Sequence, residues 1–514
     1  MRRPNRRPNY LEAKDITNWE ETADFIVFKE SADTIAINGD TGAEISRNTD
    51  SATVIQAAID TLVSDGLIFI KPGTYEISTP ISLDSTNNNV TLKGSGMGYP
   101  LNTAATILTI DANINCIEAH GTSANRITAP TFIDFKIYNP DSNSGIGISI
   151  NYARHARVTN CSFRSIVGEA ISVLSSWGMT VEGCIFTSCG DSGTTKPTID
   201  FNTTGGEFTT ASRITDCSFQ TDFYRSIQSR STSVFISGNY FEGNNTVAPS
   251  SGFIWHTSTE ARIIGNVMSD SRANSAVTNI RIYSEHAIIA CNSIFGGQYG
   301  IRLDSSGAPQ GCIICFNSLI ECQDYGIRVQ EDKPNLIFGN VCDTCGDGTN
   351  LGGIAVEGEA YVYGNVIFDS QENGITINGA QNSIISNNWI FEQDNSGVQV
   401  NGIEGIGAED NNFIFDNIIQ DFTGAAITGT GASTLIRRNI GYVTENGGVT
   451  GNVADGGTFA HGCSSTPTYV VVTPSTANEF VSVTAIGAAN VTVAIKKHDG
   501  SAGTAQPLYW RAYV

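Results

Sequence analysis

A short phrase recurs along most of this sequence at intervals of 22 to 33 residues. Each copy contains two β-forming residues, a small or polar residue, an Asn or Cys, one variable residue and an apolar residue. A period of this size is typical of a solenoid, in which each repeat forms one coil. The anchor Asn or Cys of successive copies lies at Cys161, Cys184, Cys217, Asn239, Asn266, Asn292, Asn317, Asn340, Asn365, Asn388, Asn417 and Asn439.

A second phrase, a small residue followed by an aliphatic one, usually lies about nine residues after the anchor, as at Ala170-Ile171, Ser226-Ile227 and Gly326-Ile327. β-forming residues and glycine turns dominate, and helical periodicity is absent, so leucine-rich and helical repeats fit the pattern poorly. One coil per repeat, stacked in parallel, predicts an all-β fold, a right-handed parallel β-helix of about 12 coils.

The stacking explains the choice of anchor residue. Equivalent positions in successive coils lie about 4.8 Å apart, so each Asn can donate its side-chain amide to the carbonyl of the Asn in the next coil. A cysteine is small enough to occupy the same position without a partner. Cys322 and Cys345 lie five residues after their anchors, and this spacing permits either a disulfide or a reduced stacked pair.

The charge balance excludes some partners. The chain has 51 acidic and 29 basic side chains, which give a formal net charge of −22. An acidic surface repels phosphate, so nucleic acid and anionic membranes are not expected partners. No stretch of about 18 apolar residues occurs, so no membrane insertion is expected. Residues 1–10 contain four arginines, and this basic arm is either a flexible tail or a segment that docks to an acidic partner.

Both ends of a β-helix need cover, because an open coil exposes a sheet edge and the hydrophobic interior. Residues 50–63 have the pattern of an amphipathic helix that begins at Asp50 or Ser51. Residues 25–45 alternate polar and apolar side chains around two glycine turns and predict a β-hairpin. Four strand-like runs between residues 469 and 513 predict a small antiparallel β domain at the other end.

The helix at 50–63, followed by residues 66–77 and 90–96, resembles the opening of the pectate-lyase-like superfamily, which polysaccharide-degrading β-helices and viral tailspikes share. In that superfamily the short helix covers the N-terminal end of the β-helix. We therefore expect four parts: a basic arm and lead-in at 1–24, hairpin, capping helix and first coils at 25–100, the β-helix at 101–460, and the C-terminal β domain at 461–514.

The resemblance implies a viral tailspike, fibre or cell-surface protein that binds a surface polysaccharide, with or without cleaving it. A secreted polysaccharide lyase or glycoside hydrolase is one alternative, and a purely structural filament protein is another. The Gly-His-Gly and Arg-Ile-Lys motifs of polygalacturonases do not occur. The resemblance implies an extracellular or virion location. No apolar signal segment follows the arginines, so either the numbering starts after processing or the protein leaves its cell by another route. A homotrimer is the expected assembly, with the basic arm docking it to a larger particle.

One outward column carries an arginine in three consecutive coils, with a tyrosine ahead of two of the strands. Guanidinium groups pair with carboxylate or sulfate and tyrosine rings stack on sugars, so this basic strip predicts a site for an anionic sugar. The alternative is a solvated face on which neighbouring acids neutralise the arginines. The predicted substrate-binding residues are Arg281, Arg302, Arg328, Tyr299, Tyr325 and Asp304. The neutralising acids would be Asp304, Glu331 and Asp332.

A second column carries carboxylates four residues after the anchor. Asp369, Glu392 and Asp421 occupy consecutive coils, and carboxylates at such spacings are the catalytic groups of glycosidases. These three residues are the predicted catalytic groups, and the alternative is a column that serves solubility. No cofactor is predicted, although such acids could hold a divalent cation such as calcium. Trp177 and Trp255 are predicted either as sugar platforms or as packing residues in turns.

Overall fold

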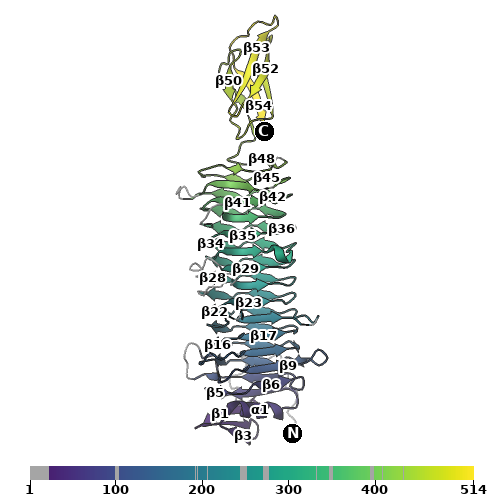
Figure 1. Ribbon diagram of the computed structural model, residues 1–514, viewed down its shortest axis with the longest axis vertical. Helices are drawn as coiled ribbons and strands as arrows, with labels where there is room; N and C mark the ends of the chain where they lie inside the picture. Colours follow the sequence, from purple (N-terminus) through teal and green to yellow (C-terminus); the bar gives the residue numbers. More distant parts are fainter. Residues whose placement is uncertain are drawn as a thin grey trace. The chain divides into compact units, whose positions relative to one another are not determined.

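A computed structural model describes residues 22–98, 104–191, 193, 195–204, 206–243, 252–269, 277–330, 333–346, 351–393, 399–407, 409–431 and 433–514. The chain divides into two compact units, Met1–Ile313 (unit 1) and Ile314–Val514 (unit 2). Both units contain stacked coils with three short parallel strands in each coil (Figure 1). The parallel β-helix is therefore confirmed, and the solenoid has about 13 turns, one more than predicted.

In unit 1, each coil contributes one strand to each of three parallel sheets, which we call sheets A, B and C. Sheet A contains β4 (Gly66–Ile70), β7 (Val90–Lys93), β11 (Thr131–Ile133), β15 (Arg157–Thr159), β18 (Thr180–Glu182), β21 (Arg213–Thr215), β24 (Phe235–Ser237), β27 (Arg262–Ile264) and β30 (Ile288–Ala290). Sheet B contains β5 (Gly73–Ile77), β8 (Thr106–Ile110), β12 (Lys136–Tyr138), β16 (Ser162–Arg164), β19 (Ile185–Thr187), β22 (Ser218–Gln220), β25 (Tyr240–Glu242), β28 (Val267–Ser269) and β31 (Ser293–Phe295). Sheet C contains β6 (Ile81–Asp84), β9 (Ile117–His120), β13 (Ile148–Asn151), β17 (Ile171–Leu174), β20 (Ile199–Asn202), β23 (Arg225–Ser229), β26 (Gly252–His256), β29 (Thr278–Ile282) and β32 (Tyr299–Leu303).

In unit 2 the same three strands recur in each coil. Sheet A contains β33 (Ile313–Cys315), β36 (Asn335–Phe338), β39 (Ala360–Tyr363), β42 (Ile384–Ser386), β45 (Phe413–Phe415) and β48 (Leu435–Arg437). Sheet B contains β34 (Ser318–Ile320), β37 (Val341–Asp343), β40 (Val366–Phe368), β43 (Trp389–Phe391) and β46 (Ile418–Ile419). Sheet C contains β35 (Tyr325–Val329), β38 (Gly352–Val356), β41 (Asn373–Asn378), β44 (Asn401–Ile406) and β47 (Ile427–Thr428).

The interior of the coils consists of stacked identical or similar side chains. In unit 1, Phe163, Phe186 and Phe219 lie in sheet B strands of consecutive coils, and their ring centroids are 5.1 and 4.8 Å apart. In three-residue strands such as β15 and β19 the middle residue points inward and is buried, so its neighbours on both sides point outward. Each outward position is therefore repeated from coil to coil, which makes columns of side chains the natural unit of this surface.

The asparagine ladder predicted from the anchors is confirmed. In unit 2, Asn340 donates its side-chain amide to Asn365 Oδ1 at 3.0 Å, and Asn365 donates to Asn388 Oδ1 at 2.9 Å. The same oxygen also accepts the backbone N–H of the preceding Asn, as in the 3.0 Å bond from Asn340 to Asn365. The second amide hydrogen satisfies a strand carbonyl in the preceding coil, such as Ile337 O at 3.1 Å from Asn365. Each ladder Asn thus satisfies polar groups that the bend would otherwise bury without partners.

The cysteines are reduced. All twelve are free thiols, so Cys322 and Cys345 form no disulfide. Cys161 replaces the ladder Asn in unit 1, and its thiol donates to Phe132 O at 3.7 Å. Burial raises the pKa of the Cys161 and Cys217 thiols well above its usual value. A buried thiol that stays protonated is a weak nucleophile, so these cysteines serve packing.

The N-terminal cap is also confirmed. Helix α1 (Ser51–Thr61) begins after Asp50, whose carboxylate accepts the N–H of Ala52 at 3.2 Å. Val54 and Ala58 are buried as predicted, together with Ile55 and Ile59, and the helix packs against the strands of the first coil. The segment before it forms a three-stranded antiparallel meander rather than a single hairpin. Its strands are β1 (Phe25–Glu30), β2 (Asp33–Asn38) and β3 (Glu44–Asn48).

The last part of unit 2 contains two three-stranded antiparallel sheets, with strand orders β49-β54-β51 and β50-β53-β52. The four predicted strands are present as β51 (Tyr469–Pro474), β52 (Glu479–Ile486), β53 (Asn490–Lys497) and β54 (Leu508–Tyr513). Two further strands, β49 (Glu445–Val449) and β50 (Thr458–Ala460), come from before residue 461. Between the sheets lies a core that includes Val491, Val493 and Leu508, so we call this part the C-terminal sandwich.

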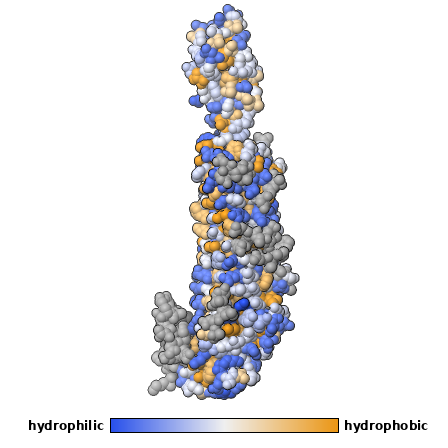
Figure 2. Space-filling view, turned by 90° about the vertical axis from the view of Figure 1, so that its left-hand side faces the viewer, coloured by the Kyte–Doolittle hydropathy of each residue, from blue (hydrophilic) through white to orange (hydrophobic). Residues whose placement is uncertain are grey.

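Figure 2 views the coils from the side of sheet B, where apolar side chains gather in patches. Outward residues of sheet B that are exposed include Tyr240 and Val267 in unit 1, and Trp389 and Ile418 in unit 2. Among the described residues, no helix has both the length and the apolar composition needed to cross a membrane.

The ladder predicts the effect of removing one amide. Asn365→Ala removes the oxygen that accepts two hydrogen bonds from Asn340, one from its backbone N–H and one from its side-chain amide. It also removes the amide that donates to Ile337 O. We expect the free energy of unfolding to fall by about 3 kcal/mol, since each buried polar group left without a hydrogen-bond partner costs about 1–3 kcal/mol. Thermal or denaturant unfolding followed by circular dichroism measures it. Asn378→Ala, at an exposed strand end, is the control and should change stability by less than about 0.5 kcal/mol. Equal effects of the two substitutions would contradict the ladder's role.

Candidate functional site

The basic strip exists in unit 1, but its charges are paired. Arg281 and Arg302 are adjacent partners in consecutive sheet C strands. Arg281 donates to Asp304 Oδ2 through Nη2 at 2.5 Å and through Nε at 3.1 Å. Arg302 Nη2 lies 3.1 Å from the same oxygen. Burial alone would raise the pKa of Asp304, but the hydrogen bond and the charge of Arg281 lower it below its usual value. The two arginines and this carboxylate together carry one positive charge.

Arg328, in unit 2, has a carboxylate partner of its own. Its Nη2 lies 2.7 Å from Glu357 Oε1, and Gln330 Nε2 donates to the other oxygen of Glu357 at 3.0 Å. Tyr299 and Tyr325 are 6% and 8% exposed, and each ring lies beneath the guanidinium of its own coil, Arg302 at 5.1 Å and Arg328 at 6.0 Å. The tyrosines therefore support the arginines and present little surface to a ligand. Glu331 and Asp332, the other predicted neutralising acids, lie outside the described residues.

The predicted acidic column occupies consecutive coils of unit 2. The strands before Asp369 and Glu392 are paired in register, and so are the strands before Glu392 and Asp421. Asp369 Oδ1 accepts the N–H of Gln393 at 2.6 Å, Glu392 is buried, and Asp421 is exposed. Within the described ranges, no group of three or more His, Cys, Asp or Glu side chains could hold a metal ion. The catalytic role of these carboxylates stays a prediction.

The outer face of sheet C in unit 1 gathers a longer set of functional side chains than the sequence predicted. The inward isoleucines of β20, β23, β26, β29 and β32 are fully buried, so the residue after each points outward. Strand register places these outward residues side by side in consecutive coils. We call them the sheet C column: Asp200, Gln228, Trp255, Arg281 and Arg302.

Arg225, two residues before the inward isoleucine of β23, joins the column. Its Nη1 donates to Gln228 Oε1, and Gln228 Nε2 donates to Asp200 Oδ1 at 3.2 Å. Its guanidinium carbon lies 3.1 Å from the centroid of the Trp255 ring. Burial lowers the pKa of Arg225 to about 10. A side chain that gives up its proton more readily than an ordinary arginine thus lies beside a buried carboxyl group.

Trp255 connects the two halves of the column. Its ring stacks on Tyr283 with centroids 5.0 Å apart and an interplanar angle of 16°. The Arg281 guanidinium lies 4.6 Å from the same ring. The indole is therefore held between Arg225 and Arg281 in neighbouring coils, with planar groups stacked along the face. Such a row is preorganised, because its rotamers are fixed by its own contacts.

Two carboxyl groups lie at the start of this row. Asp200 is buried, and burial followed by the charge of Glu169 raises its pKa to about 6. Glu169, one coil earlier, is 5% exposed, and its Oε1 pairs with Lys196 Nζ at 2.9 Å. Its Oε2 has no hydrogen-bond partner among the described side chains and backbone groups. The arrangement places a carboxyl of raised pKa, Asp200, near a second buried carboxyl, Glu169, whose other oxygen pairs with a lysine.

The repeat pattern contained the signal for this site. Asp200 follows the inward Ile199 as Arg281 follows the inward Ile280, so extending the arginine column toward the N-terminus would have reached it. Glu169 was harder to find, because it lies before its strand instead of within it. Burial, which separates the two carboxyls chemically, is visible only in the folded coils.

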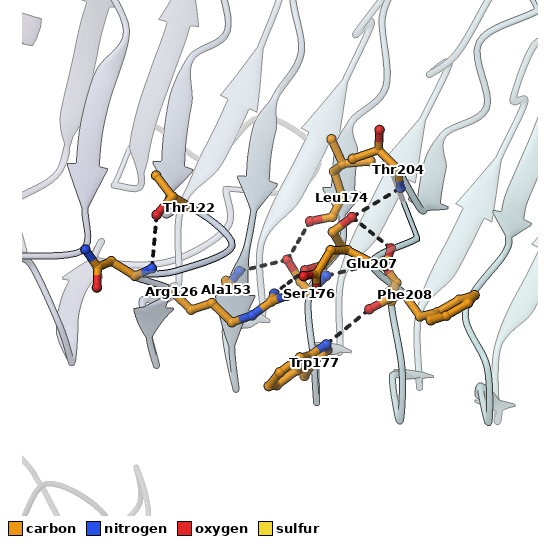
Figure 3. Close-up of polar contacts among 12 residues, drawn as sticks. Thr122, Arg126, Ala153, Leu174, Ser176, Trp177, Thr204, Glu207 and Phe208 are labelled. Atoms are coloured by element: carbon orange, nitrogen blue, oxygen red, sulfur yellow. Dashed lines mark hydrogen bonds and ion pairs between the residues drawn. The ribbon is translucent and has the colours of Figure 1, made fainter.

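Trp177 lies elsewhere on unit 1, at the corner that follows sheet C. Arg126 extends past the ring to Glu207 and to the carbonyl of Ser175 (Figure 3), and its guanidinium lies 4.0 Å from the indole centroid. The indole N–H donates to Phe208 O at 3.2 Å. The Arg126 side chain is 2% exposed and connects three coils. This cluster therefore stabilises the turns that follow sheet C.

Three family models match parts of the chain. The model described as "Right handed beta helix region" matches residues 101–268. "Rhamnogalacturonase A/epimerase, pectate lyase-like" matches residues 37–139, and "Periplasmic copper-binding protein (NosD)" matches residues 237–439. With the parallel coils and the capping helix, these matches show that the chain is a pectate lyase-like right-handed β-helix. No curated protein matches the sequence.

Several solved structures are similar in part. The protein "Geobacillus virus E2 - ORF18" is 15% identical with a TM-score of 0.42, and the match covers 57% of this chain and 58% of the viral one. The DFA-IIIase from Arthrobacter chlorophenolicus A6 without its lid is 14% identical with a TM-score of 0.42, covering 76% of this chain and 94% of that one. The A-module of the Azotobacter vinelandii mannuronan C-5 epimerase AlgE6 is 14% identical with a TM-score of 0.35, covering 76% and 95%.

The buried carboxyls predict how stability depends on pH. Burial raises the pKa of Asp222 to about 7 and that of Asp200 to about 6, against about 3.9 in an unfolded chain. Between these values the folded state binds more protons than the unfolded state, so stability falls as the pH rises from about 4 to about 7. Asp222→Asn removes an ionisation that is costly in the folded state. We expect a higher midpoint of thermal unfolding at pH 8, a much smaller gain at pH 4.5, and an unchanged midpoint at pH 3, where the carboxyl is protonated in both states.

The control for this measurement is Asp410→Asn. Hydrogen bonds from the backbone N–H groups of Ser433 and Asn411 lower the pKa of Asp410, so its ionised form is favoured in the folded state and the substitution should give no gain at pH 8. A midpoint for Asp222→Asn that is lower than that of the unaltered protein at pH 8 would contradict the raised pKa.

Proposed function

We propose that this β-helix binds a polysaccharide along the outer face of sheet C in unit 1 and cleaves it at Asp200 and Glu169. The observation that carries the proposal is a pair of buried carboxyls, of which Asp200 has a raised pKa, at the start of a fixed row of planar side chains. Perturbed carboxyls are concentrated at catalytic sites, because general acids need a pKa near the working pH. The family models that match the chain are consistent with a carbohydrate substrate.

The row suits an extended polyhydroxylated chain. Hydroxyl groups of sugars need partners that both donate and accept hydrogen bonds. The column offers Gln228 and the guanidinium groups, with Asp304 beside them, and successive coils are about 4.8 Å apart. Glu169 Oε2 is a buried acceptor without a protein partner, which a sugar hydroxyl or a water can satisfy. Because the arginines at the far end share Asp304, the row accepts uncharged sugars as well as acidic ones.

The proposed chemistry is hydrolysis of a glycosidic bond. Asp200, protonated near neutrality, gives its proton to the glycosidic oxygen as the bond from that oxygen to the anomeric carbon breaks. A water molecule forms the new bond to the anomeric carbon and gives a proton to the Glu169 carboxylate. The alternative order, in which Glu169 attacks the anomeric carbon first, differs in the configuration of the product.

A second reaction has an observation in its favour. A uronate chain can be cleaved by elimination, in which a base removes the proton beside the carboxylate and the glycosidic oxygen leaves. Arg225 is the candidate base, because its pKa is lowered to about 10. The two reactions have opposite pH dependence. Hydrolysis through Asp200 declines above its pKa of about 6, whereas elimination increases as more Arg225 is deprotonated.

The carboxyl pair predicts loss of cleavage in conservative variants. Asp200→Asn and Glu169→Gln keep shape but remove proton transfer, and we expect kcat to fall at least 100-fold, the usual contribution of general acid–base catalysis. Release of reducing ends from a polysaccharide panel across pH 4 to 9 measures hydrolysis, and ultraviolet absorbance of unsaturated products measures elimination. Glu182→Gln, at an exposed sheet A position, is the control. Loss of activity in Asp369→Asn or Glu392→Gln, with Asp200→Asn active, would move catalysis to the acidic column.

Binding is tested separately at the centre of the row. Trp255→Ala removes the ring that Arg225, Arg281 and Tyr283 contact, and we expect affinity for the bound polysaccharide to fall about tenfold or more. Trp255→Phe, which keeps a stacking ring, should recover part of it. Trp389→Ala, at an exposed position of β43 in unit 2, is the matched control, and circular dichroism checks folding. Unchanged affinity in a folded Trp255→Ala protein would contradict binding on this face.

The proposal extends to location and assembly. A protein that binds surface polysaccharide acts outside a cell or on a virion, which suits a tailspike, fibre or cell-surface protein. The basic arm, which would dock it to a larger particle, lies outside the described residues. Homotrimer formation stays a prediction from the resemblance.

A further inference from the structure

The C-terminal sandwich carries a second candidate site, independent of sheet C. Strand β54 lies between β49 and β51, and its alternating residues point to opposite sides. Leu508 and Ala512 are fully buried and Trp510 packs against the core. The other three residues of the strand therefore point away from the core: Tyr509, Arg511 and Tyr513.

The register of the three strands arranges this outer face in rows. Tyr509 lies between Thr473 and Val449 in the first row. Arg511 lies between Val471 and Gly447 in the middle row. In the last row, Tyr513 lies between Tyr469 and Glu445. The face thus has a cation at its centre and a tyrosine on either side along the strand.

The face is hollowed. A groove of about 870 Å³ runs over these rows, and Gly447, in the same row as Arg511, contributes no side chain to fill it. Tyr509 is 55% exposed and Tyr469 is 61% exposed, so their rings are available to a ligand. Arg511 is exposed, and its guanidinium makes no hydrogen bond or ion pair with the described residues. In contrast to the arginines of sheet C, this one has no carboxylate partner of its own.

We propose that this groove binds an acidic oligosaccharide, with its carboxylate or sulfate on Arg511 and its flanking rings on the tyrosines. Guanidinium pairs bidentately with such anions, and tyrosine offers an apolar face to a sugar ring. Tyr509 and Tyr513 lie four residues apart, which is about 14 Å along a strand, with Arg511 midway. That span fits a short oligosaccharide better than a single sugar.

A second copy of this chain is the competing occupant of an exposed sheet face, and charge argues against it. A two-fold contact centred on the middle row of this face would bring each Arg511 against the same residue of the partner, since a residue at the axis meets its own copy. Two like charges brought together and dehydrated repel. An acidic saccharide neutralises Arg511 instead. The proposal does not rest on the sheet C site and holds whether or not that site binds sugar.

The experiment compares one charged and one uncharged ligand on the full chain. The probes are a linear uronic acid trisaccharide and its methyl ester, titrated by calorimetry at two salt concentrations. The unaltered protein should bind the acid form more tightly, and less so at high salt. Arg511→Ala should weaken binding of the acid form about tenfold or more, and Arg511→Lys should keep part of it. Neither change should alter binding of the ester, which lacks the charge. Tyr509→Ala should weaken both.

Matched controls come from the same unit. Phe480→Ala removes a ring that is also 55% exposed, but from β52 in the other sheet of the sandwich, and Arg437→Ala removes an exposed arginine from β48. Both should bind the acid form as the unaltered protein does. Uronate binding that Trp255→Ala abolishes and Arg511→Ala leaves unchanged would assign it to sheet C and overturn the groove. Binding that persists in Trp255→Ala and is lost in Arg511→Ala supports the groove.

Self-association gives the last decisive outcome. Light scattering measures the particle mass of the unaltered protein and of Tyr509→Ala. An equal mass for both supports a face that is free to take a saccharide. A smaller mass for Tyr509→Ala, without change for Phe480→Ala, would show that a second copy covers the groove and would overturn the proposal.

Discussion

Every feature of this molecule depends on the repetition of one coil at the spacing of a parallel sheet. Neighbouring strands lie about 4.8 Å apart, so a residue at a given place in the repeat meets its equivalents above and below. At the bend before sheet B this rule places amide beside amide, and Asn340, Asn365 and Asn388 satisfy one another and the turn's backbone. Inside sheet B it places ring beside ring, as in Phe186 and Phe219. On the outside it makes columns, and a column is how this fold builds a site.

The same repetition explains what the sequence could predict. The anchors, the inward aliphatic residues and the capping helix are local patterns, and they are sufficient for the fold class, the ladder and the reduced cysteines at the anchor positions. The position of each arginine within its repeat also predicted correctly that Arg281 lies beside Arg302. The predicted alternative, in which Asp304 neutralises the arginines, is seen in its pairing with both Arg281 and Arg302. The partner of Arg328 was not predicted, because it is brought close only by the folded coils. Glu357, which pairs with Arg328, lies in the loop after β38 in the next coil, and no linear spacing singles it out.

The candidate catalytic pair shows a different limit. Asp200 and Glu169 are ordinary carboxylates in the sequence, and crowded acids such as Asp369 and Glu392 attract more attention. What distinguishes Asp200 is burial, since desolvation raises its pKa before any neighbour acts. A β-helix supplies this without a deep cleft, because Asp200 is packed between coils and Gln228 of the next coil donates to it. The rigid stack then holds acid, base and binding row in place with little reorganisation, as electrostatic catalysis requires.

Both proposed sites consist of arginines and aromatic rings, but they differ in whether the arginines have partners within the protein. On sheet C, arginines and aromatic rings alternate, but Asp304 is shared by two guanidinium groups and Gln228 accepts from a third. The guanidinium groups of that row already have hydrogen-bond partners, and its hydrogen-bonding capacity is directed along the face, which favours recognition of hydroxyl groups. In the sandwich groove, Arg511 has tyrosines on both sides and no acid against it. The chain has a formal net charge of −22, so an arginine without a carboxylate partner in an aromatic groove is unusual for it. Such an arginine favours ligands that carry a negative charge. The coils and the sandwich would then recognise different features of one polysaccharide, its hydroxyl pattern and its acidic groups.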